Sequence, residues 1–343
     1  MIAYIVRKLL MAVPLVLGVI TLIFVLVELS PGDATDRFFT PETPPEVRQL
    51  IEQKWGLDRS PVERYFIMLG NMATGDFGRS IFQERPVFDM IFESLPNTIL
   101  LSAVTLFVTY PVGIVLGSLQ AVRHNTRSDA AISVGALVLY SVPSFWLALM
   151  LQLLGGLYWT GWVEGLADAG SITQDTAALL SLPLSGMSDP YLEYIDPSAW
   201  EIFVDRAKHL LLPGFAMGLA FSGSTARYMR SALLETIRQD YIRTARAKGL
   251  HERTVIIKHA LRNALLPVIT LMGLSVPFLF SGSVLIEQVF AWPGMGRLIL
   301  SAIYEQDTPV LIACFFVFTL MVVLGNLAAD LAYALVDPRI KYD

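Results

Sequence analysis

The stretch RYMRSALLETIRQDYIRTARAKGLHERTVIIKHALRNALLP, residues 227–267, decides how the rest of the chain is organised. It carries nine arginine and lysine residues against three acidic residues, and apolar stretches near 209–226 and 264–286 flank it. Loops between membrane spans that are rich in arginine and lysine stay on the cytoplasmic side. We therefore expect residues of about 228–263 to form a cytoplasmic loop between two spans.

Apolar residues recur within this loop with helical spacing, at Leu233, Ile237, Tyr241 and Ala245. The pattern ends at Gly249, a residue type that readily adopts the left-handed conformation that terminates helices. A second amphipathic helix is expected over about 252–264, running back toward the membrane. Short helices with an apolar side among charges commonly dock into a partner's groove. A basic loop that only enforces topology is the alternative.

The composition points to a membrane protein. Of 343 residues, 54% are hydrophobic and 16% charged, and the mean hydropathy is +0.57, which is too apolar for an ordinary soluble protein. The net charge of -5 argues against nucleic acid as a partner, because nucleic-acid-binding proteins usually carry a basic surface. The single cysteine, Cys314, excludes an internal disulfide and a multi-cysteine metal site, so we expect a buried, inert thiol.

Six stretches are long and apolar enough to cross the bilayer as helices, which takes about 20 residues for roughly 30 Å of hydrocarbon. They lie near 9–29, 98–122, 132–158, 209–226, 264–286 and 310–335. The first is interpreted as a retained anchor, because its apolar run is too long for a signal peptide and no small-residue cleavage site follows Glu28. The predicted fold class is all-α, a polytopic membrane protein with six transmembrane helices.

Basic residues at the other span ends agree with this topology. With six spans, they fall on the same side as the 228–263 loop: Arg7, Lys8, Arg123, Arg127, Arg339 and Lys341. Both termini are then cytoplasmic. We divide the chain into an N-terminal anchor helix (1–30), an external segment (31–96), a transmembrane domain (97–336) with an external insertion near 160–207, and a cytoplasmic tail (337–343).

Several residues inside the predicted spans have structural or functional interpretations. Gly113 and Gly117 have the spacing that favours close helix contact. Asn326 and Asp330 share one face of the last span, where an ionisable group is costly, and we favour a hydrogen-bonding role over substrate contact. Prolines in or at the ends of spans remove a backbone donor and favour kinks, at Pro111, Pro143, Pro213, Pro267 and Pro277.

Motifs for catalysis are absent from the sequence. No Gly-x4-Gly-Lys-Ser/Thr loop occurs, so the chain is not expected to bind or hydrolyse ATP itself. The four histidines form no His-Glu-x-x-His motif, and no Gly-x-Ser-x-Gly elbow is present. We expect no catalytic residue, no metal site and no bound cofactor, so energy must enter through another polypeptide.

Four stretches carry a resemblance to a known family: YIVRKLLMAVPLVLGVITLIFVLVELSPGD near the start, DYIRTARAKGL with HALRNALLPVIT in the loop, GSVLIEQVFAWPGMGRLILSAI after the fifth span, and NLAADLAYALVDPRIKY near the end. Over nearly its whole length the chain resembles permease subunits of ATP-binding-cassette (ABC) importers, specifically the B-type subunit of dipeptide and oligopeptide systems. The resemblance implies the type I ABC importer transmembrane fold in a bacterial inner membrane, with half of a translocation pathway.

In that family the cytoplasmic loop is the coupling helix, which sits in a groove of the ATPase. Arg243, Thr244 and Ala245 match the family's Glu-Ala-Ala and Gly249 its glycine. The general signature of the family has a glutamate where this chain has Arg243, and its proline lies closer to the glycine than Pro267 does here. Peptide-type permeases share both departures. The resemblance implies these docking residues: Asp240, Tyr241, Arg243, Thr244, Ala245, Lys248 and Gly249.

The implied partners are a homologous second permease subunit, one or two ATP-binding subunits that hold ATP and Mg²⁺, an extracytoplasmic substrate-binding protein and membrane lipid. After the fifth span, VFAWPGMGR places Trp292 at the level of the lipid headgroups. The resemblance implies a scaffold beside the outer gate, made of Trp292, Pro293, Gly294, Gly296 and Arg297. Membrane anchoring alone is the alternative.

Other transport functions stay open at this point. A secondary transporter or channel fits the topology, although such proteins concentrate ionisable residues within their spans, where this chain has few. Within the resembling family, nickel complexes, glutathione and some sugars are alternatives to di- and oligopeptides. The binding protein usually sets selectivity, so the sequence favours peptide without fixing it.

Overall fold

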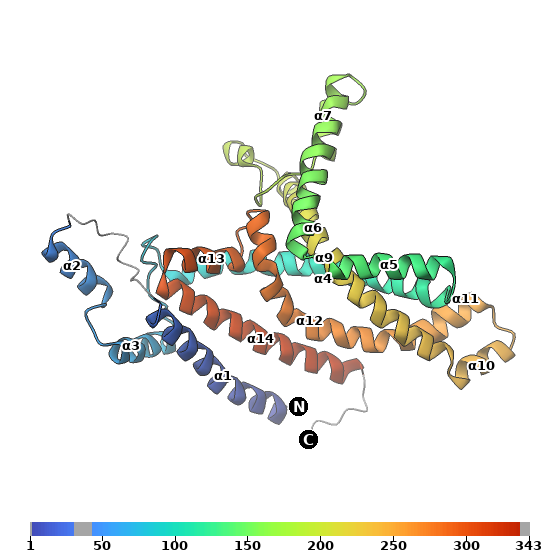
Figure 1. Cartoon of the computed structure of the whole chain (residues 1–343), viewed down its shortest axis with the longest axis horizontal. Helices are drawn as coiled ribbons and strands as arrows, with labels where there is room; N and C mark the ends of the chain where they lie inside the picture. The colour runs from blue at the N-terminus through green and yellow to red at the C-terminus, as the bar shows by residue number, and fades with distance from the viewer. Residues whose placement is uncertain (1, 31–42, 337–343) are drawn as a thin grey trace. The chain divides into compact units, whose positions relative to one another are not determined.

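A computed structural model describes residues 2–30 and 43–336 (Figure 1). Over these residues the regular elements are helices, apart from one isolated bridge between Arg79 and Pro86, which confirms the all-α prediction. The predicted tail 337–343, with Arg339 and Lys341, lies outside the described residues. The chain divides into two compact units. The first contains residues up to Thr98 together with Gly294–Leu327, and the second contains Ile99–Pro293 and the end of the last helix.

The first unit is built around the start of α4 and two helices from the C-terminal part of the chain. Its elements are α1 (Ile2–Glu28), α2 (Pro45–Trp55), α3 (Pro61–Ala73), the start of α4 (Val87–Val122), α13 (Met295–Glu305) and most of α14 (Thr308–Val336). Val87, Ile299 and Val310 lie in its core with Cys314. Cys314 is fully buried and free, which confirms the expected buried thiol.

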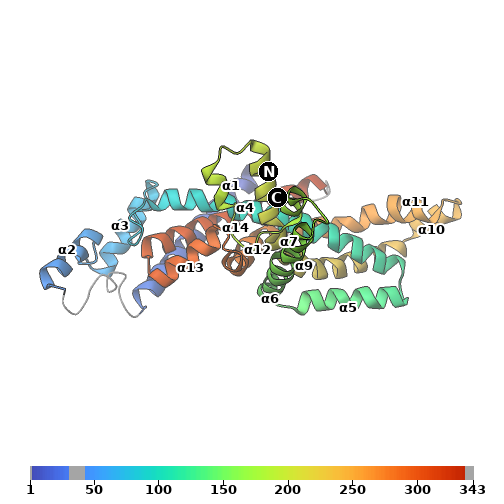
Figure 2. The same cartoon turned by 90° about the horizontal axis from the view of Figure 1, so that it is seen from above.

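The second unit contains the remaining helices (Figure 2). In chain order they are the rest of α4, α5 (Arg127–Ser141), α6 (Ser144–Leu151), the π-helical η2 (Gln152–Trp159), α7 (Thr160–Asp168), α8 (Gln174–Leu180), the 3-10 helix η3 (Pro190–Tyr194), α9 (Ala199–Ile237), α10 (Asp240–Ala247), α11 (Glu252–Thr254), the π-helical η4 (Val255–Leu261) and α12 (Arg262–Val289). A Ser198 and Glu201 capping box starts α9.

Glycines bring α4 and α9 into close contact. A Cβ built on Gly113 would lie 2.5 Å from the Cβ of Thr225, and one on Gly117 would lie 2.3 Å from the carbonyl oxygen of Ala226. Only a residue without a side chain fits at these two positions of α4. The predicted packing role of both glycines is therefore confirmed.

Replacing Gly117 by alanine is expected to lower the thermal midpoint of unfolding. The added methyl group meets a backbone oxygen that cannot rotate away, and overpacking of this kind costs roughly 1–3 kcal/mol. Gly135→Ala in α5 is the matched control, because nothing lies within 4 Å of its built Cβ. Equal midpoints for the two variants in detergent would contradict the close approach of α4 and α9.

The predicted spans agree with the structure in part. Three described helices are long and apolar enough to cross a membrane, over Tyr4–Glu28, Val87–Val122 and Thr308–Ala328, and a bent pair, Arg127–Ser141 with Ser144–Asp168, could form a fourth. The six-span count and the orientation of the termini stay predictions.

The predicted span over 132–158 falls within this pair, which bends by 100°. The bend follows Ser141, where Val142 and Pro143 both have extended backbone, with ψ of 128° and 132°. A proline disfavours helical conformation in the residue before it and supplies no N–H of its own. The kink expected from Pro143 is therefore present.

Candidate functional site

The cytoplasmic loop predicted from the sequence forms a separate short helix after α9. The expectation of one helix running from Leu233 through Ala245 is wrong, because α9 ends at Ile237 and α10 begins at Asp240. Gln239 between them is extended, with φ of −69° and ψ of 149°. No glycine or proline marks this break in the sequence.

The break changes which residues of α10 face inward. Ile242 is fully buried and Ala245 is 8% exposed, whereas Tyr241 is 43% exposed. The inward face is therefore 242 and 245, three residues apart, and the expected face of 241 and 245 is wrong. Restarting the helical pattern at Asp240, an acidic residue suited to a first helical turn, would have found Ile242.

A hydrophobic cluster fixes α10 to its own chain. Ile242 and Ala245 pack with Leu233 of α9 and with Val255 and Ala260 of η4. Figures 1 and 2 show α10 and α11 side by side at one end of α9 and α12. The predicted docking residue Ala245 therefore packs inward, and a partner would meet the other side of α10.

Gly249 closes the turn between the two helical segments. Its φ is +78°, a conformation that favours glycine, and its N–H donates to the carbonyl oxygen of Arg246 at 2.9 Å. The predicted glycine turn is confirmed. The second helix begins at Glu252 as expected, but it has no separate end, since α11, η4 and α12 continue to Val289.

The outward side of α10 is polar and charged. The side chains of Asp240 and Arg243 are 95% and 74% exposed and lie 3.5 Å apart. The Thr244 hydroxyl donates to the carbonyl oxygen of Asp240, and Lys248 is exposed. Tyr241 accepts a 2.8 Å hydrogen bond from Asn263, which ties its exposed ring to α12. The structure thus places five of the predicted docking residues on α10 and the other two, Lys248 and Gly249, directly after it, with Ala245 packed inward.

An ion pair that no motif in the sequence indicates spans the Gly249 turn. Arg246 donates to Glu252 at 2.7 and 3.1 Å, in the geometry of a bidentate pair. The hydrogen bond from Arg246 lowers the pKa of the Glu252 carboxyl below its usual value. Because both side chains are substantially exposed, this pair shapes the turn and adds little stability.

The segment after α12 is placed differently from the predicted headgroup anchor. Trp292 is fully buried and packs with Leu101, Met217 and Phe290, so the expectation that its ring sits among lipid headgroups is wrong. The local sequence could not reveal this, because burial of an indole depends on residues far along the chain.

The predicted scaffold residues fall into both units. Trp292 and Pro293 belong to the second unit, whereas Gly294, Gly296 and Arg297 belong to the first. In the first unit Met295 N–H donates to the Thr98 hydroxyl at 2.8 Å as α13 begins. These five residues therefore do not form one site within either unit, and their role in gating stays a prediction.

The predicted polar pair of the last span also divides between the units. Asn326 and Asp330 are both half-buried on α14, but Asn326 belongs to the first unit and Asp330 to the second. Among the residues that the structure describes, no three His, Cys, Asp or Glu side chains are grouped so that they could hold a metal ion.

Two cavities of about 250 and 360 Å³ lie in the first unit. Apolar residues such as Phe24, Met68 and Ile312 line the smaller one, and Arg64 borders both. None of the predicted site residues lines either cavity. The arrangement of α10 is therefore the best-defined candidate site in the described part of the chain.

The family match and the relatives that are similar to this chain all describe transport permeases. The family described as binding-protein-dependent transport system inner membrane component matches residues 113–342. The oligopeptide transport system permease protein AppB of Bacillus subtilis (strain 168) is 38% identical over 343 residues, covering 100% of both chains. The dipeptide transport system permease protein DppB of Escherichia coli (strain K12) is 35% identical, covering 100% of this chain and 99% of its own.

A solved structure supports the fold. A chain of the MetNI methionine ABC transporter, in an inward-facing conformation, superimposes with a TM-score of 0.53 at 17% identity, covering 73% of this chain and 97% of its own. This likeness confirms the predicted transmembrane fold. The family match covers more than half of the chain and includes α10 and Gly249. This chain therefore belongs to the inner membrane components of binding-protein-dependent transport systems, the permease subunits of ABC importers.

Proposed function

We propose that this chain forms half of a translocation pathway for di- or oligopeptides and that a separate ATPase drives it through α10. The observation that carries the proposal is the division of α10 into two sides. Ile242 and Ala245 fix its inner side to the protein, while Asp240 and Arg243 leave a charged outer side exposed. The names of the relatives, oligopeptide and dipeptide permeases similar over the full length, support a peptide substrate.

The ATPase groove receives the outer side of α10, with contacts from Asp240, Tyr241, Arg243, Thr244, Lys248 and the Gly249 turn. ATP and Mg²⁺ bind to the ATPase subunits and not to this chain, which has no catalytic residue. When the ATPase subunits close, α10 moves, and its buried side transfers the displacement to α9 and η4, with which it packs.

The complete importer contains a second, homologous permease subunit, one or two ATPase subunits and an extracytoplasmic binding protein that delivers the substrate. Both termini lie in the cytoplasm of a bacterium. Trp292, Pro293, Gly294, Gly296 and Arg297 form a scaffold beside the outer gate, and Asn326 and Asp330 make hydrogen bonds within the subunit.

Reconstitution of the complete complex in proteoliposomes tests this function. Uptake of a labelled peptide is expected only with binding protein outside and ATP available to the ATPase subunits. Uptake driven by an ion gradient without ATPase subunits would instead establish a secondary transporter. Mass spectrometry of ligand bound to the purified binding protein then distinguishes peptide from a nickel complex, glutathione or a sugar.

A further inference from the structure

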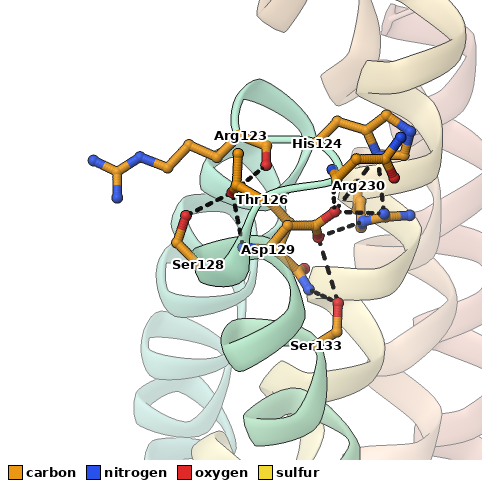
Figure 3. A network of polar contacts seen from close by, with 9 residues as sticks. Arg123, His124, Thr126, Ser128, Asp129, Ser133 and Arg230 are labelled. Atoms are coloured by element: carbon orange, nitrogen blue, oxygen red, sulfur yellow. Dashed lines mark hydrogen bonds and ion pairs between the residues drawn. The ribbon is translucent and has the colours of Figure 1, made fainter.

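A polar cluster that the docking function does not use joins the turn between α4 and α5 to α9 (Figure 3). Arg230 of α9 donates from Nε to Asp129 Oδ1 at 3.1 Å and from Nη2 to Asp129 Oδ2 at 2.9 Å. Asp129, at the start of α5, is only 5% exposed. Two parallel hydrogen bonds between a guanidinium and a carboxylate fix both position and orientation.

The same guanidinium also holds His124 in the turn. Arg230 Nη2 lies 3.1 Å from His124 Nδ1. His124 Nδ1 also lies 3.5 Å from Asp129 Oδ2, so the ring contacts both members of the ion pair. The backbone N–H of Asn125 donates to Asp129 Oδ2 at 3.0 Å, at a residue with φ of +62°. The turn is therefore shaped around the ion pair.

A third helix joins the cluster. Gln120 of α4 donates to the Ser133 hydroxyl at 2.8 Å, and this hydroxyl donates to Asp129 Oδ1 at 3.4 Å. Gln120 is 1% exposed. One carboxylate thus connects α4, α5 and α9.

Further contacts hold α5 against α9. A Cβ built on Gly223 of α9 would lie 2.4 Å from the carbonyl oxygen of Ala136, so the two backbones nearly touch. The Arg227 guanidinium lies 4.3 Å from the centre of the Tyr140 ring. Arg230 itself is about two turns before the end of α9, after which α10 begins.

We propose that Asp129 and Arg230 are positioning residues for energy coupling, because their ion pair makes the α4–α5 turn and α5 move together with α9. This inference rests on the proposed function of α10. A displacement of α10 then reaches α4 and α5 as well as the helix that carries Arg230. A bidentate pair with a buried carboxylate suits this role, since separating it would leave the Asp129 charge buried without the arginine charge opposite it.

The test compares Asp129→Asn and Arg230→Lys with the wild type in the complete reconstituted importer. Asparagine removes the charge, and lysine keeps the charge but loses the two-pronged geometry. Labelled peptide taken up per ATP hydrolysed is expected to fall by about fivefold or more, the lower end of typical coupling between sites. Asp129→Glu, which keeps the carboxylate, is expected to recover part of the loss. Ser128→Ala is the matched control, because Figure 3 shows the hydroxyl of this half-buried residue bonded to Thr126 and to neither Asp129 nor Arg230.

A distance measurement separates this inference from the function on which it rests. Spin labels replace Val134 of α5 and Tyr228 of α9, which are 62% and 56% exposed. In the wild-type background we expect one narrow distribution of distances between the two labels, unchanged on ATP binding. In Asp129→Asn we expect this distribution to broaden. This readout needs no transported substrate, so it stands even if the peptide assignment fails.

Three results would overturn the proposal. One is a wild-type ratio of uptake to hydrolysis in both Asp129→Asn and Arg230→Lys. The second is an unchanged distance distribution in Asp129→Asn. The third is a parallel fall in ATPase copurification, in the thermal midpoint of unfolding and in coupling for Asp129→Asn, Arg230→Lys and Asp129→Glu. That result would assign the pair to folding alone. If ATPase copurification falls only in variants of α10, the result concerns the proposal that α10 docks the ATPase and leaves the proposal for Asp129 and Arg230 unaffected.

Discussion

Replacing Gly249 by proline is expected to uncouple ATP hydrolysis from transport while the protein remains inserted in the membrane. The native φ of +78° is closed to proline, whose ring fixes φ near −65°. Proline also removes the N–H that donates to Arg246. The turn must therefore be rebuilt, and α10 loses its position relative to α11. A misplacement that costs about 1.4 kcal/mol of binding energy weakens contact with a partner roughly tenfold.

The measurement is peptide uptake per ATP hydrolysed in proteoliposomes, with membrane insertion checked by extraction from isolated membranes. Gly249→Asn is the matched control, because asparagine enters the left-handed region more easily than other side chains and keeps the backbone N–H. We expect this variant to retain most of the coupling. A proline variant with wild-type coupling would show that the turn does not position the docking helix.

A bulky residue at Ala245 is expected to have a comparable effect by a different route. Ala245 is 8% exposed and packs with Ile242, Leu233 and Val255, so the ring of Ala245→Phe has no room on the inner side of α10. Overpacking costs roughly 1–3 kcal/mol, and the chain relieves it by moving α10 away from α9 and η4. We expect loss of transport per ATP by about tenfold, the factor that 1.4 kcal/mol gives.

Ala245→Ser is the control for this variant, since it changes the side chain while nearly keeping its volume. Both variants are compared for ATPase copurification and for coupled peptide uptake. Normal coupling in the phenylalanine variant would contradict this prediction. If less ATPase then copurifies, α10 is displaced but its inner side does not transmit the movement. If copurification is unchanged, the site accommodates the ring without moving α10.

The sequence predicted those features that depend on one residue and its neighbours. Gly249 could be recognised as a helix terminator, and Gly113 with Gly117 as a packing motif, because glycine has properties that no other residue shares. The kink at Pro143 follows from the same kind of local chemistry. Its size of 100° does not, since it depends on the helices that pack against each side of the bend.

Features that depend on distant contacts escaped prediction. The break at Gln239 has no glycine or proline, and it rotates the inward face of α10 from Tyr241 to Ile242. Tryptophan is a residue type common at membrane interfaces, but Trp292 is buried among residues from other helices. The Asp129 and Arg230 pair joins positions 101 residues apart, and nothing in a single sequence marks such a pair.

The helical path from Glu252 to Val289 runs without a break from the turn after α10 through α12. At a rise of 1.5 Å per residue it is about 57 Å long. If it tilted by about 5° around its Glu252 end, its far end would sweep through about 5 Å, the height of one helical turn. If an ATPase docks on α10 as proposed, a small shift of that helix would therefore become a displacement of several ångströms at the far end of α12.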